Sequence, residues 1–283
     1  MTDEFSLRPT RVTADGVEIV TYRAGAHDMS SDGDIVLCHG TPWSAATWLP
    51  LVRLLAETHR VFLWDMPGYG RSISESDVAI DLPRQSRRLA ALIDHWRLDR
   101  PHVVAHDIGG AVALGAHLFE ASEFASLYLL DVVTLDPWGS AFFRLVAENE
   151  TTFAALPANL HAALVREYIA GAARSALAPD WVDKLALPWL SRAGQRAFYS
   201  QIAQLDPRHT RPLVERLAEV RCPTHIGWGD LDPWIPVEQA SQLAAKLPGT
   251  TGISLFPRAG HLVPLEATTE LRHDLARWLT RST

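Results

Sequence analysis

The sequence is poor in cysteine, in basic charge and in long apolar runs, and each shortage excludes a class of protein. Only Cys38 and Cys222 occur among 283 residues, so we expect two buried thiols in a reducing compartment rather than a disulfide framework. A formal net charge of −7 does not suit nucleic-acid binding, which needs clustered Lys and Arg. Because no uncharged stretch could span a bilayer and the N-terminus has no leader pattern, we expect a cytoplasmic protein without a membrane partner.

Motifs for metals and nucleotides are missing as well. The twelve histidines include no His-Glu-x-x-His pattern, and no paired-cysteine motif occurs, so no metal site is expected. Gly68-x-Gly70 lacks the third glycine of a dinucleotide-binding loop. The sequence therefore predicts a protein that acts on a small-molecule substrate without a cofactor. It leaves the oligomeric state open, with a homodimer among the alternatives.

Apolar residues, in contrast, make up 47% of the chain and fall in short runs. Wholly apolar runs of this length are typical of strands that are covered on both faces. One such strand is predicted at 35–38, and further strands are predicted at 60–64, 101–106, 125–130, 224–228 and 252–256. Two β-rich pieces flank Asp15-Gly16, which favours an antiparallel hairpin at one edge. Helical patterns between the strands, such as 82–96, predict a doubly wound, mostly parallel sheet.

The alternation of strands and helices stops after the strand at 125–130. Helical patterns replace it, at 139–147, 158–173, 180–187 and 194–205. This change predicts a helical cap at 133–218, inserted into an α/β core that is formed by residues 1–132 and 219–283.

The most informative stretch is 103–110, with the sequence VVAHDIGG. An apolar run that stops at an acid and continues into small residues predicts a strand feeding a helix through a sharp turn. In the G-x-S-x-G nucleophile elbow, small residues flank the nucleophile because larger ones do not fit the strained backbone. Ala105 and Gly109 hold the small positions, and Asp107 stands where serine usually does.

An acid and a histidine follow the elbow in a meaningful order. Asp107, then Asp131 or Asp232, then His261 resembles the order of nucleophile, acid and histidine in the α/β-hydrolase fold. Further motifs of that fold follow predicted strands: His39-Gly40-Thr41-Pro42, Asp65-x-x-Gly68-x-Gly70-x-Ser72, Trp228-Gly229-x-x-Asp232 and Gly260-His261. The resemblance spans nearly the whole chain and implies an eight-stranded sheet flanked by helices. Asp232 has the spacing of the wider family and is preferred as the acid, while Asp131 holds a position that some dehalogenases use.

An aspartate nucleophile changes the chemistry that is expected. Its attack on an ester carbonyl would form a high-energy anhydride, whereas attack on a saturated carbon forms an alkyl-enzyme ester. His261 would then activate water against the Asp107 carbonyl, and the acid would hold the histidine tautomer. The resemblance implies that the Thr41 and Ile108 N–H groups form the oxyanion hole.

This pattern resembles epoxide hydrolases and haloalkane or haloacetate dehalogenases. Haloalkane dehalogenases carry Trp after the nucleophile and commonly Asn in the His-Gly-x-Pro loop, where this chain has Ile108 and Thr41. Haloacetate dehalogenases carry arginines after the nucleophile, where this chain has Ile108 and Ala111. The sequence therefore favours opening of a small apolar epoxide, with dehalogenation as the alternative. A non-hydrolytic receptor, lyase or cyclase on the same fold is the alternative from another class.

Epoxide hydrolases donate hydrogen bonds from cap tyrosines to the opening oxygen, and the cap contains Tyr168 and Tyr199. Tyr199 lies late in the cap, where these families place a site tyrosine, and is preferred. Packing explains Tyr168 about as well as function does. Trp43 and His39, in and beside the His-Gly-x-Pro loop, are further candidates for substrate binding.

Overall fold

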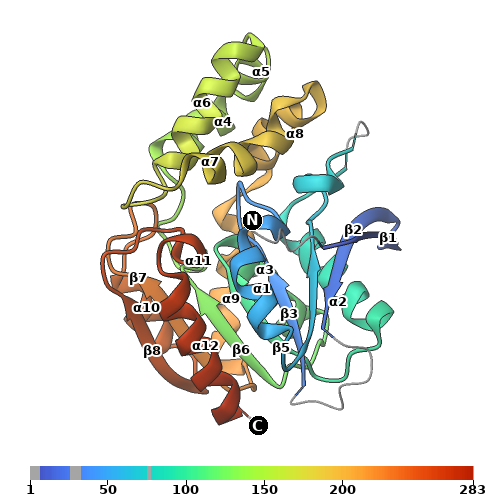
Figure 1. The fold of residues 1–283 in the computed structure, drawn as a ribbon, viewed down its shortest axis with the longest axis vertical. Coiled ribbons are helices and arrows are strands. Elements are labelled where there is room, and N and C mark those ends of the chain that lie inside the picture. Colours follow the sequence, from blue (N-terminus) through green and yellow to red (C-terminus); the bar gives the residue numbers. More distant parts are fainter. Residues whose placement is uncertain (1–6, 26–32, 75–77, 283) are drawn as a thin grey trace.

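The computed structural model describes residues 7–25, 33–74 and 78–282, and its centre is one eight-stranded sheet (Figure 1). The strand order is β1-β2-β4-β3-β5-β6-β7-β8. Only β1–β2 and β2–β4 pair antiparallel, so the predicted mostly parallel sheet is confirmed. The strands are β1 (Pro9–Ala14), β2 (Val17–Ala24), β3 (Asp34–Cys38), β4 (Arg60–Trp64), β5 (His102–His106), β6 (Ser126–Leu130), β7 (Thr224–Gly229) and β8 (Thr250–Phe256).

The hairpin that joins β1 to β2 forms at the predicted pair. Asp15 and Gly16 have φ values of +50° and +72°, the left-handed region that a tight hairpin turn requires. Ala14 pairs with Val17 directly across the turn. The two-residue turn therefore sets the register of the antiparallel edge.

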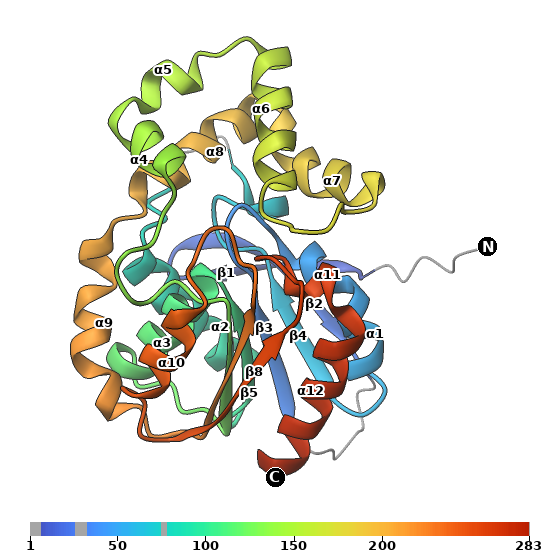
Figure 2. The ribbon, with the colours of Figure 1, turned by 90° about the vertical axis from the view of Figure 1, so that its left-hand side faces the viewer.

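Helices cover both faces of the sheet, as Figure 2 shows. Alternate strand residues point to opposite faces, so Ile35 and Leu37 join one buried cluster and Val36 and Cys38 join the other. The face with Ile35 is covered by α1 (Leu49–Leu55), α11 (Val263–Glu266) and α12 (Thr268–Ser282). The face with Val36 is covered by α2 (Leu82–Trp96), α3 (Ile108–Phe119) and α10 (Glu238–Ala244). None of the helices in the described residues is long and apolar enough to cross a membrane.

A helical layer lies over one end of the sheet, beyond the C-terminal ends of the parallel strands (Figures 1 and 2). It consists of α4 (Ala141–Glu148), α5 (Glu150–Ala154), α6 (Ala158–Ala170), α7 (Pro179–Ala186), the 3₁₀ turn η3 (Leu187–Leu190) and α8 (Arg192–Gln204). The predicted cap range also contains α9 (Arg211–Arg216), but α9 packs against α3 on the flank of the core. Leu213 is buried there near Gly115, so the chain has already returned to the core before residue 218.

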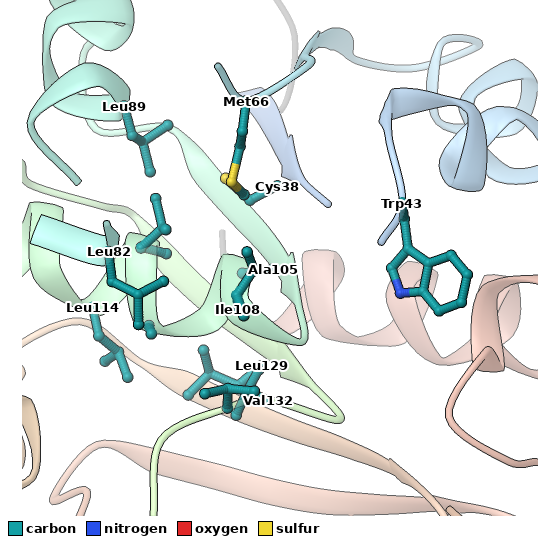
Figure 3. Packing of buried hydrophobic residues seen from close by; sticks show 14 of the residues in the cluster. Cys38, Trp43, Met66, Leu82, Leu89, Ala105, Ile108, Leu114, Leu129 and Val132 are labelled. Atoms are coloured by element: carbon teal, nitrogen blue, oxygen red, sulfur yellow. The ribbon is translucent and has the colours of Figure 1, made fainter. Parts of the chain in front are cut away.

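The core around residues 103–110 is closely packed (Figure 3). Ala105 and Ile108 are fully buried, and Cys38 and Leu129 belong to the same cluster. This packing fixes the end of β5 and the start of α3 from both sides, and therefore also the turn between them.

Candidate active site

Asp107 sits on the turn between β5 and α3, in a conformation that few residues other than glycine adopt. Its φ is +54° and its ψ is −125°, which costs roughly 1–3 kcal/mol for a non-glycine residue. Three backbone hydrogen bonds hold it there. Asp107 N donates to Leu130 O at 3.1 Å, and Asp107 O accepts from the backbone N–H groups of Gly110 and Val133, both at 3.0 Å. The turn therefore presents the carboxylate in one fixed position.

The small residues beside the turn allow a second loop to approach closely. A Cβ atom on Gly109 would lie 2.6 Å from His39 O, and one on Gly40 would lie 2.4 Å from the Asp107 Cβ. Neither contact is sterically allowed for a larger residue. The two glycines thus bring the loop after β3 against the nucleophile elbow.

The two oxygens of the Asp107 carboxylate have different surroundings. Thr41 N donates to Asp107 Oδ1 at 2.7 Å, while Asp107 Oδ2 lies 3.3 Å from His261 Nε2. Ile108 is the first residue of α3, so the positive end of that helix begins directly beside the carboxylate. One oxygen therefore accepts from Thr41, one of the two predicted oxyanion-hole donors, and the other faces the histidine.

Asp232 is the acid that contacts His261. Its Oδ2 lies 2.8 Å from His261 Nδ1, and both side chains are fully buried. Its Oδ1 accepts from Trp234 N at 2.7 Å and from Ile235 N at 3.0 Å. These hydrogen bonds from two backbone N–H groups fix the direction of the carboxylate.

Asp131 is also fully buried, but it is hydrogen-bonded differently. Its Oδ1 accepts from Gly229 N at 2.7 Å, and its Oδ2 has no partner among the described residues. Burial, and after it the negative charge of Asp232, raises the pKa of Asp131 well above its ordinary value. The raised pKa favours the neutral form of Asp131, whose hydrogen bond to Gly229 braces β7 just ahead of the loop that carries Asp232.

His261 lies between two carboxylates, and this decides its charge. Burial lowers its pKa, but the charges and hydrogen bonds of Asp232 and Asp107 outweigh burial and raise the pKa well above the ordinary value. The imidazole is therefore an imidazolium in the resting site.

A narrow pocket of about 20 Å³ lies beside Asp107. Its walls are mainly apolar and aromatic, and they come from both the core and the helical layer. The lining residues are Thr41, Asp107, Ile108, Val133, Trp138, Gly139, Ser140, Phe143, Tyr168, Trp234 and Ile235. This lining suits a small apolar ligand with one reactive polar group.

The structure brings Tyr168, not Tyr199, into this pocket. Tyr168 stacks on Trp234, with ring centroids 4.7 Å apart, and Ser140 lines the same pocket. Burial and then the Asp107 charge raise the pKa of Tyr168 well above the ordinary value. The Tyr199 hydroxyl instead lies 2.9 Å from His161 Nδ1, inside the helical layer. The sequence favours Tyr199, but in the structure its hydroxyl points to His161 of α6, and Tyr199 does not line the pocket.

His39 and Trp43, which the sequence suggests as substrate-binding residues, do not line this pocket. His39 Nδ1 lies 2.7 Å from Gly40 O, and Nε2 accepts from Met66 N at 2.9 Å. The backbone thus occupies both ring nitrogens, and none is left for a ligand. Trp43 is buried beside Trp234, with their parallel rings 5.8 Å apart, and it does not belong to the pocket lining.

Two contributors were not predicted from the sequence. Trp234 lies against both Tyr168 and His261, and its position two residues after Asp232 could have indicated it. Gln201 on α8 accepts hydrogen bonds from the Thr41 and Tyr69 hydroxyls. No sequence signal separates Gln201 from the other polar residues of an amphipathic helix.

Comparison with known proteins agrees with this architecture. Residues 35–273 match the model of the Alpha/beta hydrolase family. The crystal structure of an alpha/beta hydrolase fold protein from Burkholderia ambifaria is 39% identical, with a TM-score of 0.88 over 94% of this chain and 96% of that chain. The putative carbamate hydrolase RutD of Variovorax paradoxus is 26% identical over 264 residues, which cover 89% of this chain and 93% of the relative. The chain also matches the dihydrolipoyllysine-residue acetyltransferase component of the acetoin cleaving system from Pseudomonas putida, at 26% identity over 87% of this chain, but spans only 63% of that relative.

The fold and the family model together define the class. The chain belongs to the alpha/beta hydrolase family, and it is a hydrolase of the α/β fold.

Proposed function

We propose that this hydrolase opens small, mostly apolar epoxides to diols through a covalent ester on Asp107. One observation carries the proposal. The Asp107 carboxylate has one oxygen on the Thr41 N–H and the other beside His261, at the floor of an apolar pocket. That arrangement suits a nucleophile whose carbonyl is later attacked by water.

In the first step, Asp107 Oδ2 attacks an epoxide carbon and the carbon–oxygen bond of the ring breaks. Tyr168 donates its phenolic proton to the leaving oxygen, which becomes a hydroxyl group. The raised pKa of Tyr168 keeps the phenol protonated until that oxygen develops charge. Esterification removes the Asp107 charge that helps to hold the proton on His261. The imidazolium can then return a proton to the Tyr168 phenolate and become a neutral base.

In the second step, neutral His261 takes a proton from water as the water attacks the Asp107 carbonyl carbon. The negative charge develops on the oxygen that accepts the Thr41 N–H bond. Collapse of the tetrahedral species gives the diol, the Asp107 carboxylate and a protonated His261. These are the charges of the resting site, so the cycle closes without a cofactor.

Dehalogenation through the same ester is the runner-up. It would need donors for the departing halide, and the positions where haloalkane dehalogenases place them hold Ile108 and Thr41. A phenol suits an oxygen leaving group that must gain a proton. Tyr168, which lines the same pocket as Asp107, therefore favours the epoxide.

Product analysis tests the proposal. The purified protein is incubated with a panel of small epoxides and of haloalkanes, and diol and halide are measured in parallel. We expect diol from at least one epoxide. Halide release without any diol would move the activity to dehalogenation, and ligand binding without turnover would favour a receptor.

Trapping the ester tests the mechanism separately. His261→Gln should form the ester but not hydrolyse it, which leaves a mass adduct on the Asp107 peptide. Asp107→Asn is the matched control and should show no adduct. For the wild type, single turnover in H₂¹⁸O should place the label first in Asp107. Turnover without adduct in His261→Gln and without label in Asp107 would exclude covalent catalysis.

A further inference from the structure

A glutamine on the helical layer reaches down to the oxyanion loop. Gln201 Oε1 accepts from the Thr41 hydroxyl at 2.7 Å and from the Tyr69 hydroxyl at 2.9 Å. All three residues are buried, and Gln201 is 1% exposed. Gln201 belongs to α8, whereas Thr41 follows β3 and Tyr69 follows β4. A single side-chain oxygen therefore joins the helical layer to two loops of the core.

Thr41 is the residue through which this contact reaches the reacting carboxylate. Its hydroxyl bonds to Gln201, while its backbone N–H donates to Asp107 Oδ1 at 2.7 Å. The hydroxyl and the N–H group belong to one residue, so the contact to Gln201 helps to hold the backbone that carries the N–H donor. The chain of contacts runs from α8 through Thr41 to the nucleophile.

The amide end of Gln201 indicates that the side chain is not present for stability alone. Gln201 Nε2 is buried without a hydrogen-bond partner in the part of the chain that the structure describes. A buried N–H donor without an acceptor costs free energy, and an apolar side chain of the same length would avoid that cost. A destabilising side chain that contacts the oxyanion loop fits a role in activity.

We propose, on the basis of the proposed function, that Gln201 is a positioning residue that aligns the Thr41 N–H for hydrolysis of the Asp107 ester. Ester formation takes charge away from the carboxylate, so it gains little from this donor. Water attack on the ester builds charge on the oxygen that faces Thr41. The position of α8 on the core therefore governs the rate of ester hydrolysis and leaves the rate of ester formation nearly unchanged.

Gln201→Met tests this, because methionine has a similar length and no hydrogen-bonding amide. In the full-length protein with an epoxide that the wild type turns over, we expect kcat to fall roughly tenfold to a hundredfold. KM should fall in parallel and leave kcat/KM nearly unchanged, because only ester hydrolysis slows. Rapid quench with intact-mass measurement should show the alkyl-enzyme accumulating. Gln201→Glu keeps an acceptor oxygen and should restore much of the hydrolysis rate.

Gln204→Met is the matched control. Gln204 lies on the same helix and also joins it to the core, since its Oε1 accepts from Ile80 N at 2.8 Å. Its side chain bonds to Ile80 and Ser200 rather than to Thr41, so its loss should not cause the ester to accumulate. Thr41→Val removes the hydroxyl but keeps the N–H, and should reproduce the Gln201→Met effect. The double variant should be no slower than either single variant, because both act through one contact.

The outcomes separate this inference from the proposed function. Wild-type decay of the ester in Gln201→Met, or equal falls of kcat and kcat/KM, would overturn the inference alone. Accumulation in Gln204→Met to the same extent would overturn it too, because general loosening of the cap would then suffice. If Gln201→Met does not fold, Thr41→Val supplies the same readout. Absence of an adduct even in His261→Gln would overturn the proposed function, and this inference with it.

Discussion

The two sides of the site are held by different forces. The floor consists of Asp107, Asp232 and His261 at the ends of the strands, and the roof is the part of the helical layer that carries Tyr168 and Gln201. On the floor, backbone hydrogen bonds from neighbouring strands and turns fix Asp107 and Asp232. On the roof, Tyr168 and Gln201 are held by ring stacking and by single side-chain hydrogen bonds between elements. Backbone hydrogen bonds at strand ends follow from the fold itself, whereas side-chain contacts depend on how the helices are seated. The floor should therefore control whether reaction occurs, and the roof which substrate reacts and how fast.

The largest effect is expected on the floor, from the two acids beside His261. Asp232→Asn should lower kcat by about 10⁴-fold, because the amide no longer stabilises the imidazolium or fixes its tautomer. Asp131→Asn should cost less than about tenfold, since Asp232 and not Asp131 is hydrogen-bonded to His261, and an amide can still accept from Gly229 N. Steady-state kinetics of the two variants on one epoxide measure the ratio. A larger loss in Asp131→Asn would show that the wrong carboxyl has been assigned to His261.

In the roof, substitution of the two tyrosines should also cause unequal losses of activity, but the difference should be smaller than for the two acids. Tyr168→Phe removes the proposed proton donor and should lower kcat/KM by roughly 10²–10⁴-fold. Tyr199→Phe removes only the contact to His161 inside the helical layer, so activity should stay within about threefold. Paired kinetics on an epoxide give the comparison. Equal losses would indicate that the roof acts through its packing and not through one phenol.

The same division explains what the sequence could predict. Asp107, Asp232 and His261 each follow an apolar strand, so parallel pairing brings them to one edge of the sheet. Tyr168 and Tyr199 lie on helices whose rotation is set by packing between α4, α6 and α8. Periodicity places a residue on a face of its helix, but it does not say which neighbouring element that face contacts. The sequence therefore could not show which tyrosine faces the pocket, although the helices themselves were predicted within a few residues.

Hydrolysis of the ester should depend on pH through His261. In the free site Asp232 and Asp107 together raise the pKa of His261 above its ordinary value despite burial, and esterification removes the Asp107 charge. The pKa of His261 should thus be lower in the ester than in the free enzyme. Because only the neutral imidazole can accept a proton from water, ester decay should slow by about tenfold for each pH unit below that pKa. Quenched single turnovers between pH 5 and 9 measure it, and decay that slows as the pH rises would contradict the assignment.

The smallest effect concerns how the folding stability of the protein depends on pH. His106 Nε2 donates to His261 O at 2.8 Å, and burial, together with the charge of His261, lowers the His106 pKa to about 4. The unfolded chain gains this proton near pH 6.5 and the folded chain only near pH 4, so stability is present above pH 6.5 and is lost as the pH falls through this window. The loss from this group should reach about 3 kcal/mol in the free energy of unfolding. His106→Gln keeps a donor for the His261 carbonyl but cannot titrate, so its stability should fall less between pH 7 and pH 4. Denaturant unfolding at several pH values measures how the free energy of unfolding of each protein changes with pH. Equal pH dependence of the two proteins would show that His106 does not couple folding to pH.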